Sequence, residues 1–265
     1  MVTYLSRKML QHSFAGTVYH FQKVPPLSYR GRFGVYVHIP FCRSKCSFCP
    51  FYKEIYSEEA CSGFMEAVVR EIEECDVQGV AKWIYFGGGT PNTLPVHDIV
   101  RIKSAVGNKM TVEAVGIELL PALIQRNYLQ ELKANGFTKV SIGIESFGHH
   151  ILQATGRTLT KNDHPQEMVA FARSIGLWVN VDLMVGLPAQ SGATFLEDIR
   201  KAGVVRPDQI TIYPFMVIRG LHTPAGIPSR RQFRLIEQAG ELLAANGYER
   251  KNIWTFARGQ DLYDS

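Results

Sequence analysis

Cys42, Cys46 and Cys49 stand close together in the stretch YVHIPFCRSKCSFCPFYK. Iron-sulfur clusters are held by cysteine thiolates, and a cubane cluster of four irons normally takes four of them. Three cysteines therefore predict a 4Fe-4S cluster with one open iron, and an open coordination position is what a catalytic metal centre needs. The alternative is a structural zinc site completed by His38, although Cys-x3-Cys is less typical of zinc than paired Cys-x2-Cys units.

The composition limits what else the chain can be. It has 265 residues, 46% of them hydrophobic, which is enough for one large α/β domain or two small ones. Two of its five cysteines, Cys61 and Cys75, fall on an apolar helical stripe where core packing explains them. Five cysteines with three in one short stretch do not fit an extracellular disulfide framework, so we expect a metal site in a reducing compartment.

Charge and hydropathy argue against two kinds of partner. The net charge of +5 comes from 29 basic and 24 acidic residues, without the basic blocks typical of a nucleic-acid-binding face. No apolar run approaches the ~20 residues of a membrane-spanning helix, and the first residues lack the apolar centre of a secretory signal. We therefore predict a cytoplasmic protein that binds no nucleic acid and spans no membrane.

Short runs rich in β-branched residues alternate with longer stretches of helical period from Gly34 onward. The predicted strands cover 35–39, 83–86, 111–115, 140–144, 177–183 and 209–213. The predicted helices cover 58–75, 96–106, 121–135, 163–175, 192–203 and 228–246, with Gly136, Gly176 and Gly247 as stops. Such alternation implies a parallel sheet, either open and doubly wound or curved into a barrel. Polar and glycine-rich positions follow almost every strand, which favours a partial (β/α)6 barrel with its loops at one mouth.

Three parts are predicted along the chain. Residues 1–33, interrupted by Pro25-Pro26 and Gly31, form an extended N-terminal lead-in. Residues 34–220 form the barrel, and residues 221–265 begin a C-terminal region.

The cysteine loop and the motifs after it resemble the radical S-adenosylmethionine (SAM) enzymes related to oxygen-independent coproporphyrinogen III oxidase. The triad after YVHIPF is highly specific, and GGGTP, SIGIESF and VDLMVGLP follow it in the family's order. The resemblance implies a partial barrel of the triose-phosphate-isomerase (TIM) type, a 4Fe-4S cluster on the three cysteines, and cleavage of SAM to a 5'-deoxyadenosyl radical. Family members continue through a substantial C-terminal region where this chain stops at Ser265, so we expect a truncated chain.

The resemblance also implies which residues bind SAM. Tyr36 would lie beside the first SAM, and the glycine-rich turn would meet its methionine part. Asp182 matches an acid near a second SAM site, so one or two SAM molecules are implied. The full set implied by the resemblance is Tyr36, Gly88, Gly89, Thr90, Glu113, Glu145, Arg157, Asp182 and Phe215.

Several of these residues have ordinary structural explanations when the resemblance is set aside. Glu113 and Arg157 would be exposed charges, Asp182 would be a hydrogen-bonding residue at a strand end, and packing would explain Phe215 as well. Many family members carry Gln where this chain has Glu145, so the charge of that contact would differ.

Two departures from the family pattern bear on the substrate. Relatives that oxidatively decarboxylate coproporphyrinogen carry another cysteine soon after the triad, where this chain has Pro50-Phe51-Tyr52. This form, with the later WTFAR stretch at 254–258, looks more like the branch that methylates or opens porphyrin-type rings in anaerobic haem use. The resemblance thus implies an enzyme acting on a tetrapyrrole, supplied with electrons by a flavodoxin-like or ferredoxin-like donor. The alternatives are a coproporphyrinogen III oxidase-like dehydrogenase and decarboxylase, and a haem chaperone that binds and transfers haem.

Overall fold

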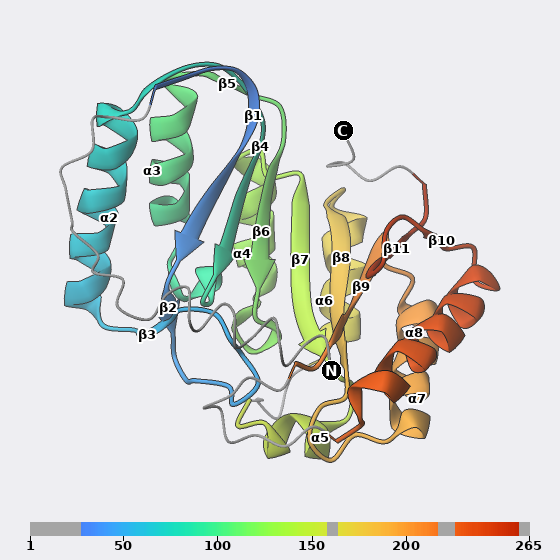
Figure 1. Cartoon of the computed structure of the whole chain (residues 1–265). Helices are drawn as coiled ribbons and strands as arrows, with labels where there is room; N and C mark the ends of the chain where they lie inside the picture. The colour runs from blue at the N-terminus through green and yellow to red at the C-terminus, as the bar shows by residue number, and fades with distance from the viewer. Residues whose placement is uncertain (1–27, 158–163, 217–225, 260–265) are drawn as a thin grey trace, which may run out of the picture.

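A computed structural model describes residues 28–157, 164–216 and 226–259 (Figure 1). Its centre is a sheet of parallel strands that pair in the order of the chain. These strands are β1 (Ser28–Ile39), β4 (Asp76–Gly88), β6 (Val115–Leu119), β7 (Lys139–Glu145), β8 (Trp178–Val185) and β9 (Gln209–Pro214). Strands that are neighbours in both sequence and space need a crossover after each one, and a helix supplies it.

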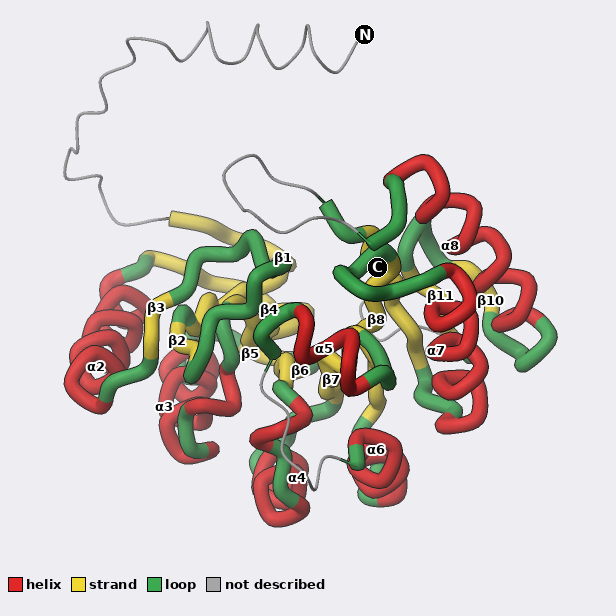
Figure 2. The backbone as a smooth tube through the Cα atoms, turned by 90° about the horizontal axis from the view of Figure 1, so that it is seen from below, coloured by secondary structure: helices red, strands yellow, loops and turns green. Residues whose placement is uncertain are grey.

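The crossover helices all lie on one side of the sheet, where they form an arc around the strands (Figure 2). They are α2 (Glu58–Glu74), α3 (Val96–Gly107), α4 (Arg126–Ala134), α6 (Pro165–Ser174) and α7 (Gly192–Val205), with α8 (Ser229–Ala244) after β9. The sheet curves with its helices outside, so the predicted partial (β/α)6 barrel is confirmed.

Shorter elements complete the described chain. They are β2 (Phe41–Cys42), β3 (Glu54–Ile55), η1 (Pro91–Thr93), β5 (Thr111–Val112), η2 (Pro121–Leu123), α5 (His149–Ala154), β10 (Glu249–Arg250) and β11 (Thr255–Ala257). Strand β11 pairs antiparallel with β9 and continues the sheet beyond the parallel part. In the described ranges, no helix is long and apolar enough to cross a membrane.

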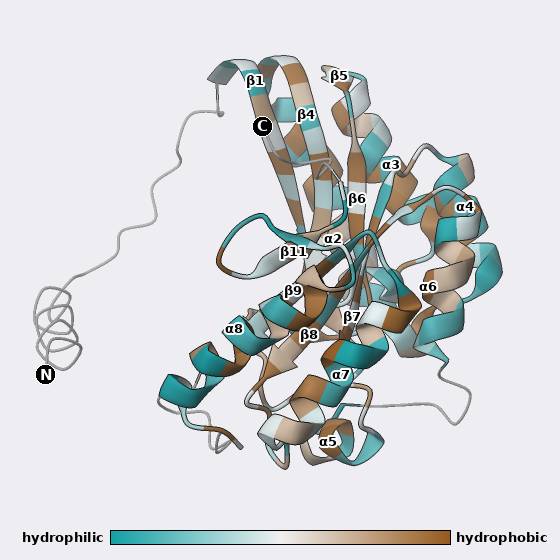
Figure 3. Cartoon of the chain, turned by 90° about the vertical axis from the view of Figure 1, so that its right-hand side faces the viewer, coloured by the Kyte–Doolittle hydropathy of each residue, from teal (hydrophilic) through white to brown (hydrophobic). Residues whose placement is uncertain are grey.

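Strand residues alternate between an apolar outer face and a polar inner face. On β7, Val140, Ile142 and Ile144 are buried against the helices, whereas Lys139 and Ser141 lie on the other face. The same alternation on β8 and β9 makes a continuous outer core. The outward surface of α8 is largely hydrophilic, as Figure 3 shows. Helix packing on one face therefore leaves the other face of the sheet free to carry a site.

The helix boundaries follow local capping chemistry. Ser57 accepts a hydrogen bond from the backbone of Ala60 at the start of α2, and Ser191 forms a capping box with Thr194 at the start of α7. The three predicted stop glycines have φ angles of 79°, 79° and 80°, a left-handed conformation that glycine adopts without steric cost.

Two predictions about the strands were wrong in detail. The predicted third strand, 111–115, is divided into β5 and β6, and β6 continues to Leu119 because its apolar residues are buried on the sheet. Gly31, predicted to interrupt the lead-in, lies inside β1 opposite Gly79 of β4. A Cβ on Gly79 would lie 2.0 Å from the carbonyl oxygen of Gly31, so the two backbones require glycine to pair this closely.

Candidate active site

The cysteine loop lies at the carboxyl end of the parallel strands, between β1 and β3 (Figure 1). Its base is closed where Glu54 N–H donates to the Pro40 carbonyl (2.8 Å) and Tyr56 N–H donates to the Cys42 carbonyl (3.0 Å). Inside the loop, Lys53 Nζ donates to the Cys49 carbonyl at 2.7 Å. These hydrogen bonds hold the backbone of the cysteine loop in place.

The far side of the loop is attached to the end of α5. Both the backbone N–H and the hydroxyl of Ser47 donate to the Thr155 carbonyl, at 2.9 and 3.0 Å. Residues more than 100 positions apart thus fix the loop from a second direction, which local sequence does not reveal.

The three thiols share one electrostatic environment. Burial raises the pKa of Cys42 and of Cys46, the charge of Cys49 raises both further, and the Arg157 guanidinium lowers both. All three are free cysteines, and the Cys42 sulfur lies 3.3 Å from Thr90 Oγ1. Thiols that influence one another beside a cation are a suitable donor set for a metal cluster that binds thiolates.

His38 is engaged elsewhere, which argues against the zinc alternative. Its Nδ1 is 3.2 Å from the Tyr36 hydroxyl, and its Nε2 is 3.1 Å from the Tyr52 carbonyl oxygen. Within the described parts of the chain, no three His, Cys, Asp or Glu side chains are grouped around a position for a single metal ion. A cubane instead takes its thiolates on separate irons, so the donor set fits a cluster.

A small group of apolar side chains packs against the cysteine loop. Cys46 and Cys49 pack against Phe48, Ile151, Met184, Leu187 and Phe215. Phe215 is therefore buried against the cysteine loop, beside the expected 4Fe-4S cluster. Apolar packing on this side limits the access of water to the thiols.

The glycine-rich turn after β4 packs against the cysteine loop. Gly89 N–H donates to the Ile39 carbonyl (2.7 Å), and Thr90 N–H donates to the Phe41 carbonyl (2.8 Å). A Cβ on Gly88 would lie 2.5 Å from the His38 ring, and one on Gly89 would lie 2.7 Å from the Pro40 backbone. Contact with the chain itself therefore requires these glycines, in addition to any approach of a ligand.

Glu113 does not join this group. Its backbone pairs with Ala81, seven residues before Gly88 on β4, and its exposed carboxylate forms a 2.9 Å ion pair with Arg32. A strand advances about 3.3 Å per residue, so this pairing places Glu113 far along the sheet from the glycine turn. The structure therefore corrects the expectation that Glu113 binds the cofactor.

Glu118, which the sequence reasoning missed, occupies the carboxyl end of β6. It accepts a hydrogen bond from Gly88 N–H at 3.2 Å. Burial, and next the charge of Asp182, raise the pKa of Glu118 to about 7. A carboxyl group whose pKa is raised by burial and by a neighbouring acid is a typical functional-site feature.

Glu145 and Arg157 meet at the carboxyl end of β7. Their side chains are 13% and 8% exposed and form a 3.2 Å ion pair, and Arg157 also donates to the Gly143 carbonyl. Burial raises the pKa of Glu145 to about 7, while Arg157 opposes the shift. Glu145 has a φ of 63°, beside an irregularity in the β7–β8 pairing. Such strain costs on the order of 1–3 kcal/mol and often accompanies functional sites.

Asp182 lies on the inner face of β8 within a hydrogen-bonded row. Its two carboxylate oxygens accept from Ser141 Oγ (2.5 Å) and from Asn180 Nδ2 (2.8 Å), and Thr211 Oγ1 donates to Asn180 Oδ1 at 3.0 Å. Burial raises the Asp182 pKa, although both hydrogen bonds lower it. The charge of Asp182 also raises the pKa of both Glu118 and Glu145, so the three acids surround one space.

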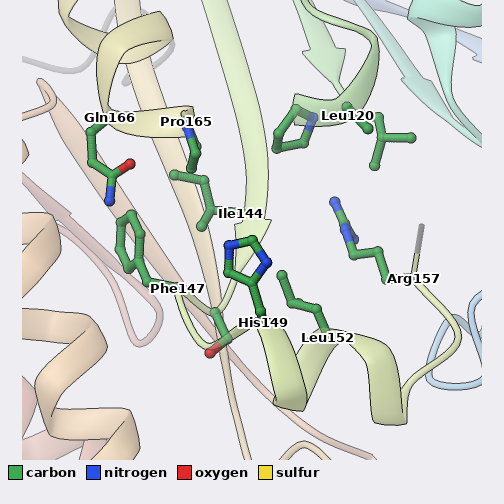
Figure 4. A pocket seen from close by; sticks show the side chains of 11 residues that line it. Leu120, Ile144, Phe147, His149, Leu152, Arg157, Pro165 and Gln166 are labelled. Atoms are coloured by element: carbon green, nitrogen blue, oxygen red, sulfur yellow. The ribbon is translucent and has the colours of Figure 1, made fainter. Parts of the chain in front are cut away.

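A small cavity lies behind this group, between the end of β7, α5 and α6 (Figure 4). Its volume is about 60 Å³, and its walls include Ile144, Phe147, His149, Leu152 and Arg157. That volume corresponds to roughly two water molecules. The space for a larger cofactor is therefore the open inner face of the sheet, where Tyr36 and the three acids lie.

The sequence profile of the radical SAM superfamily matches residues 36–202, which include all three loop cysteines and both ends of the Glu145–Arg157 pair. The chain belongs to the radical SAM superfamily. Members of this superfamily use a 4Fe-4S cluster and SAM, and the match includes every predicted cofactor residue except Phe215.

The chain is similar to individual members of this superfamily and to one solved structure. Anaerobilin synthase from Escherichia coli O157:H7 is 34% identical over 72% of this chain and 44% of its own length. The heme chaperone HemW from Synechocystis is 31% identical over 69% of this chain and 47% of its own. The structure of coproporphyrinogen III oxidase from Escherichia coli superimposes with a TM-score of 0.78 and 23% identity, over 90% of this chain and 57% of that one. This chain therefore spans about half the length of these radical SAM relatives.

Proposed function

We propose that the chain is the catalytic core of a radical SAM enzyme that modifies a porphyrin-type tetrapyrrole. The observation that carries the proposal is the grouping of three free thiols, a glycine turn and three buried acids at one end of a curved sheet. When bound on Cys42, Cys46 and Cys49, the cluster supplies the electron that cleaves SAM reductively.

The acids and the turn would hold SAM. Its ammonium and sulfonium groups are positive, and Glu118, Glu145 and Asp182 together offer carboxylates at one site. Arg157 would bind the SAM carboxylate and keep Glu145 in its strained conformation. Tyr36, exposed on the inner face and hydrogen-bonded to His38, would pack beside the cofactor.

The nature of the relatives supports a tetrapyrrole as substrate. HemW is named a heme chaperone, oxygen-independent coproporphyrinogen III oxidase is named for a porphyrinogen, and anaerobilin synthase is named for a bilin. Pro50-Phe51-Tyr52 after the triad favours ring methylation or ring opening over oxidative decarboxylation. A flavodoxin-like or ferredoxin-like donor in the cytoplasm would supply the electrons.

A haem chaperone is the second candidate, because HemW resembles this chain nearly as closely as anaerobilin synthase does. A chaperone would bind haem and transfer it without consuming SAM. Product analysis distinguishes the two functions: methylated or opened macrocycle and 5'-deoxyadenosine from the enzyme, unchanged haem from the chaperone.

The test is anaerobic reconstitution with iron and sulfide, followed by chromatography for 5'-deoxyadenosine after addition of dithionite and SAM. Cys42→Ala, Cys46→Ala and Cys49→Ala should each abolish product. Cys61→Ala and Cys75→Ala are matched controls and should keep it, because these residues lie in or beside α2. A parent protein with a loaded cluster that forms no 5'-deoxyadenosine, with or without tetrapyrrole, would contradict the enzyme and favour the chaperone.

The number of SAM molecules is a separate proposal. Asp182 lies at the family position associated with a second SAM, so we expect two per chain when substrate is present. Equilibrium dialysis with labelled SAM would measure the stoichiometry, and saturation at one SAM under both conditions would contradict it.

A further inference from the structure

The inner wall near the end of β9 has space that the residues proposed for the cluster and SAM do not fill. A cavity of about 320 Å³ lies there, lined by Thr211, Tyr213, Asn252, Ile253, Trp254 and Thr255. Ligand pockets commonly span about 300–1,000 Å³, so this volume is sufficient for part of a flat organic ligand.

Strand pairing places this cavity at the mouth. Because β11 runs antiparallel to β9, with Thr255 opposite Thr211, the turn before β11 lies at the carboxyl end of β9. That is the end of the sheet where the cysteine loop lies (Figure 1). Thr255 shares the inner face with its partner Thr211, and Ile253, in the bend before β11, lines the same cavity as Tyr213.

The turn that presents Ile253 is fixed in place. Asn252 Oδ1 accepts hydrogen bonds from the backbone N–H groups of Trp254 (2.9 Å) and Thr255 (3.0 Å). The Trp254 ring lies 6.0 Å from the ring of Phe233 on α8, which holds the turn against the outer core. Ile253 is nevertheless 65% exposed. With Tyr213, which is also exposed and lines the same cavity, Ile253 forms a contiguous apolar patch, and such patches mark binding surfaces.

Two of the residues that line the cavity lie close to the proposed SAM site. Tyr213 is 46% exposed, and the charge of Asp182 is the main cause that raises its pKa. Thr211 joins the same hydrogen-bonded row through Asn180. On the opposite rim of the sheet, Tyr36 and the cysteine-loop residue Tyr52 are also exposed. Apolar side chains therefore flank the opening on both sides of the proposed reaction centre.

We propose that Tyr213 and Ile253 form the seat against which the flat macrocycle of the tetrapyrrole packs. The inference deepens the proposed function and rests on it. An aromatic ring and an aliphatic side chain on one wall match the apolar face of a conjugated macrocycle. A ligand on this wall lies at the same end of the sheet as the cysteines and Asp182.

The experiment is an anaerobic titration of the cluster-loaded chain with coproporphyrin III, followed through the porphyrin's Soret absorption. This probe carries no metal, so ligation of a porphyrin iron by cysteine or histidine cannot produce the signal. Ile253→Ser should weaken binding about tenfold, because an apolar contact is lost, and Ile253→Asp should weaken it further by placing a charge against the macrocycle. Val204→Ser is the matched control: Val204 is 82% exposed on α7, on the outer side of the barrel, and its replacement should leave binding unchanged.

The outcomes separate the two proposals. Saturable binding that is equal in the parent, Ile253→Ser and Ile253→Asp would overturn this seat and leave the tetrapyrrole function standing. An equal loss in Val204→Ser would also overturn the seat, since binding would then not depend on this wall. A parent that forms 5'-deoxyadenosine but does not bind the porphyrin would overturn both the seat and the tetrapyrrole substrate, while the radical SAM core would remain.

Discussion

The two faces of the curved sheet are built from the same strands but carry different tasks. On β9, Ile210 and Ile212 are fully buried under the helices, whereas Thr211 and Tyr213 face the interior of the barrel. The outer face stabilises the fold through apolar burial, and the inner face holds buried acids, hydroxyls and amides that bond to one another. On each strand, therefore, the polar residues that alternate with buried apolar residues indicate the position of the proposed active site.

The largest expected difference is in stability between neighbours on β9. Ile212→Ala should lower the free energy of unfolding by about 2–5 kcal/mol, because it leaves a cavity in the outer core. Thr211→Val, of similar size to the parent residue, removes two hydrogen bonds, one from Gln209 and one to Asn180, and should cost about 1–2 kcal/mol. Urea unfolding measures both. Equal losses would contradict the division between the faces.

The acids of the inner face should make stability depend on pH. The pKa of Glu118 is near its ordinary value of about 4.3 in the unfolded chain and about 7 in the fold. The fold therefore holds the proton more tightly, so the contribution of Glu118 to stability is greatest below pH 4 and falls as pH rises to about 7, by on the order of 3 kcal/mol.

Glu118→Gln should remove the part of the pH-dependent fall in stability that Glu118 causes. Glu113→Gln is the matched control and should leave that fall unchanged, because Glu113 is exposed and pairs with Arg32. The free energy of unfolding at pH 5 and pH 8 provides the measurement. A fall in stability that Glu118→Gln leaves as steep as in the parent would show that Glu118 is not the titrating acid.

Two glycines provide a smaller contrast between site and scaffold. Gly88→Ala should lower stability by about 1–3 kcal/mol and weaken SAM binding, because Gly88 has a φ of 111° and packs against His38. Gly107→Ala, in α3 with open space around it, should be neutral or stabilising by up to about 1 kcal/mol. Thermal unfolding and SAM titration compare them, and unchanged SAM affinity in Gly88→Ala would remove the turn from the binding site.

Much of this arrangement was predictable because its causes are local. The cysteine spacing marked a loop that lies at the carboxyl end of the strands, β-branched runs located the six parallel strands of the main sheet at least in part, and stop glycines marked the ends of three helices. Glu113 was predicted to bind SAM because it matched an acid of the resembled family, and Glu118 was missed because the predicted strand ended at Val115, where β6 begins. The pairing of β6 with β4 and β7 decides that boundary, and pairing is a tertiary property.

Other features had no local signal. Glu145 adopts a left-handed conformation that its residue type does not favour, and only the surrounding contacts with Arg157 and β8 impose it. The strands β10 and β11 have two and three residues, too few for a period to be read. The cavity wall at Ile253 depends on both, so it emerged only from the structure.

The most direct test of the central claim is electron paramagnetic resonance of the reduced, reconstituted protein with and without SAM. Three cysteine ligands leave one iron open, so we predict about four irons per chain and a spectrum that changes when SAM is added. Such a change would support direct binding of SAM at the cluster. A fully loaded cluster whose spectrum is unaffected by saturating SAM, or a colourless protein that binds zinc instead of iron, would contradict the account.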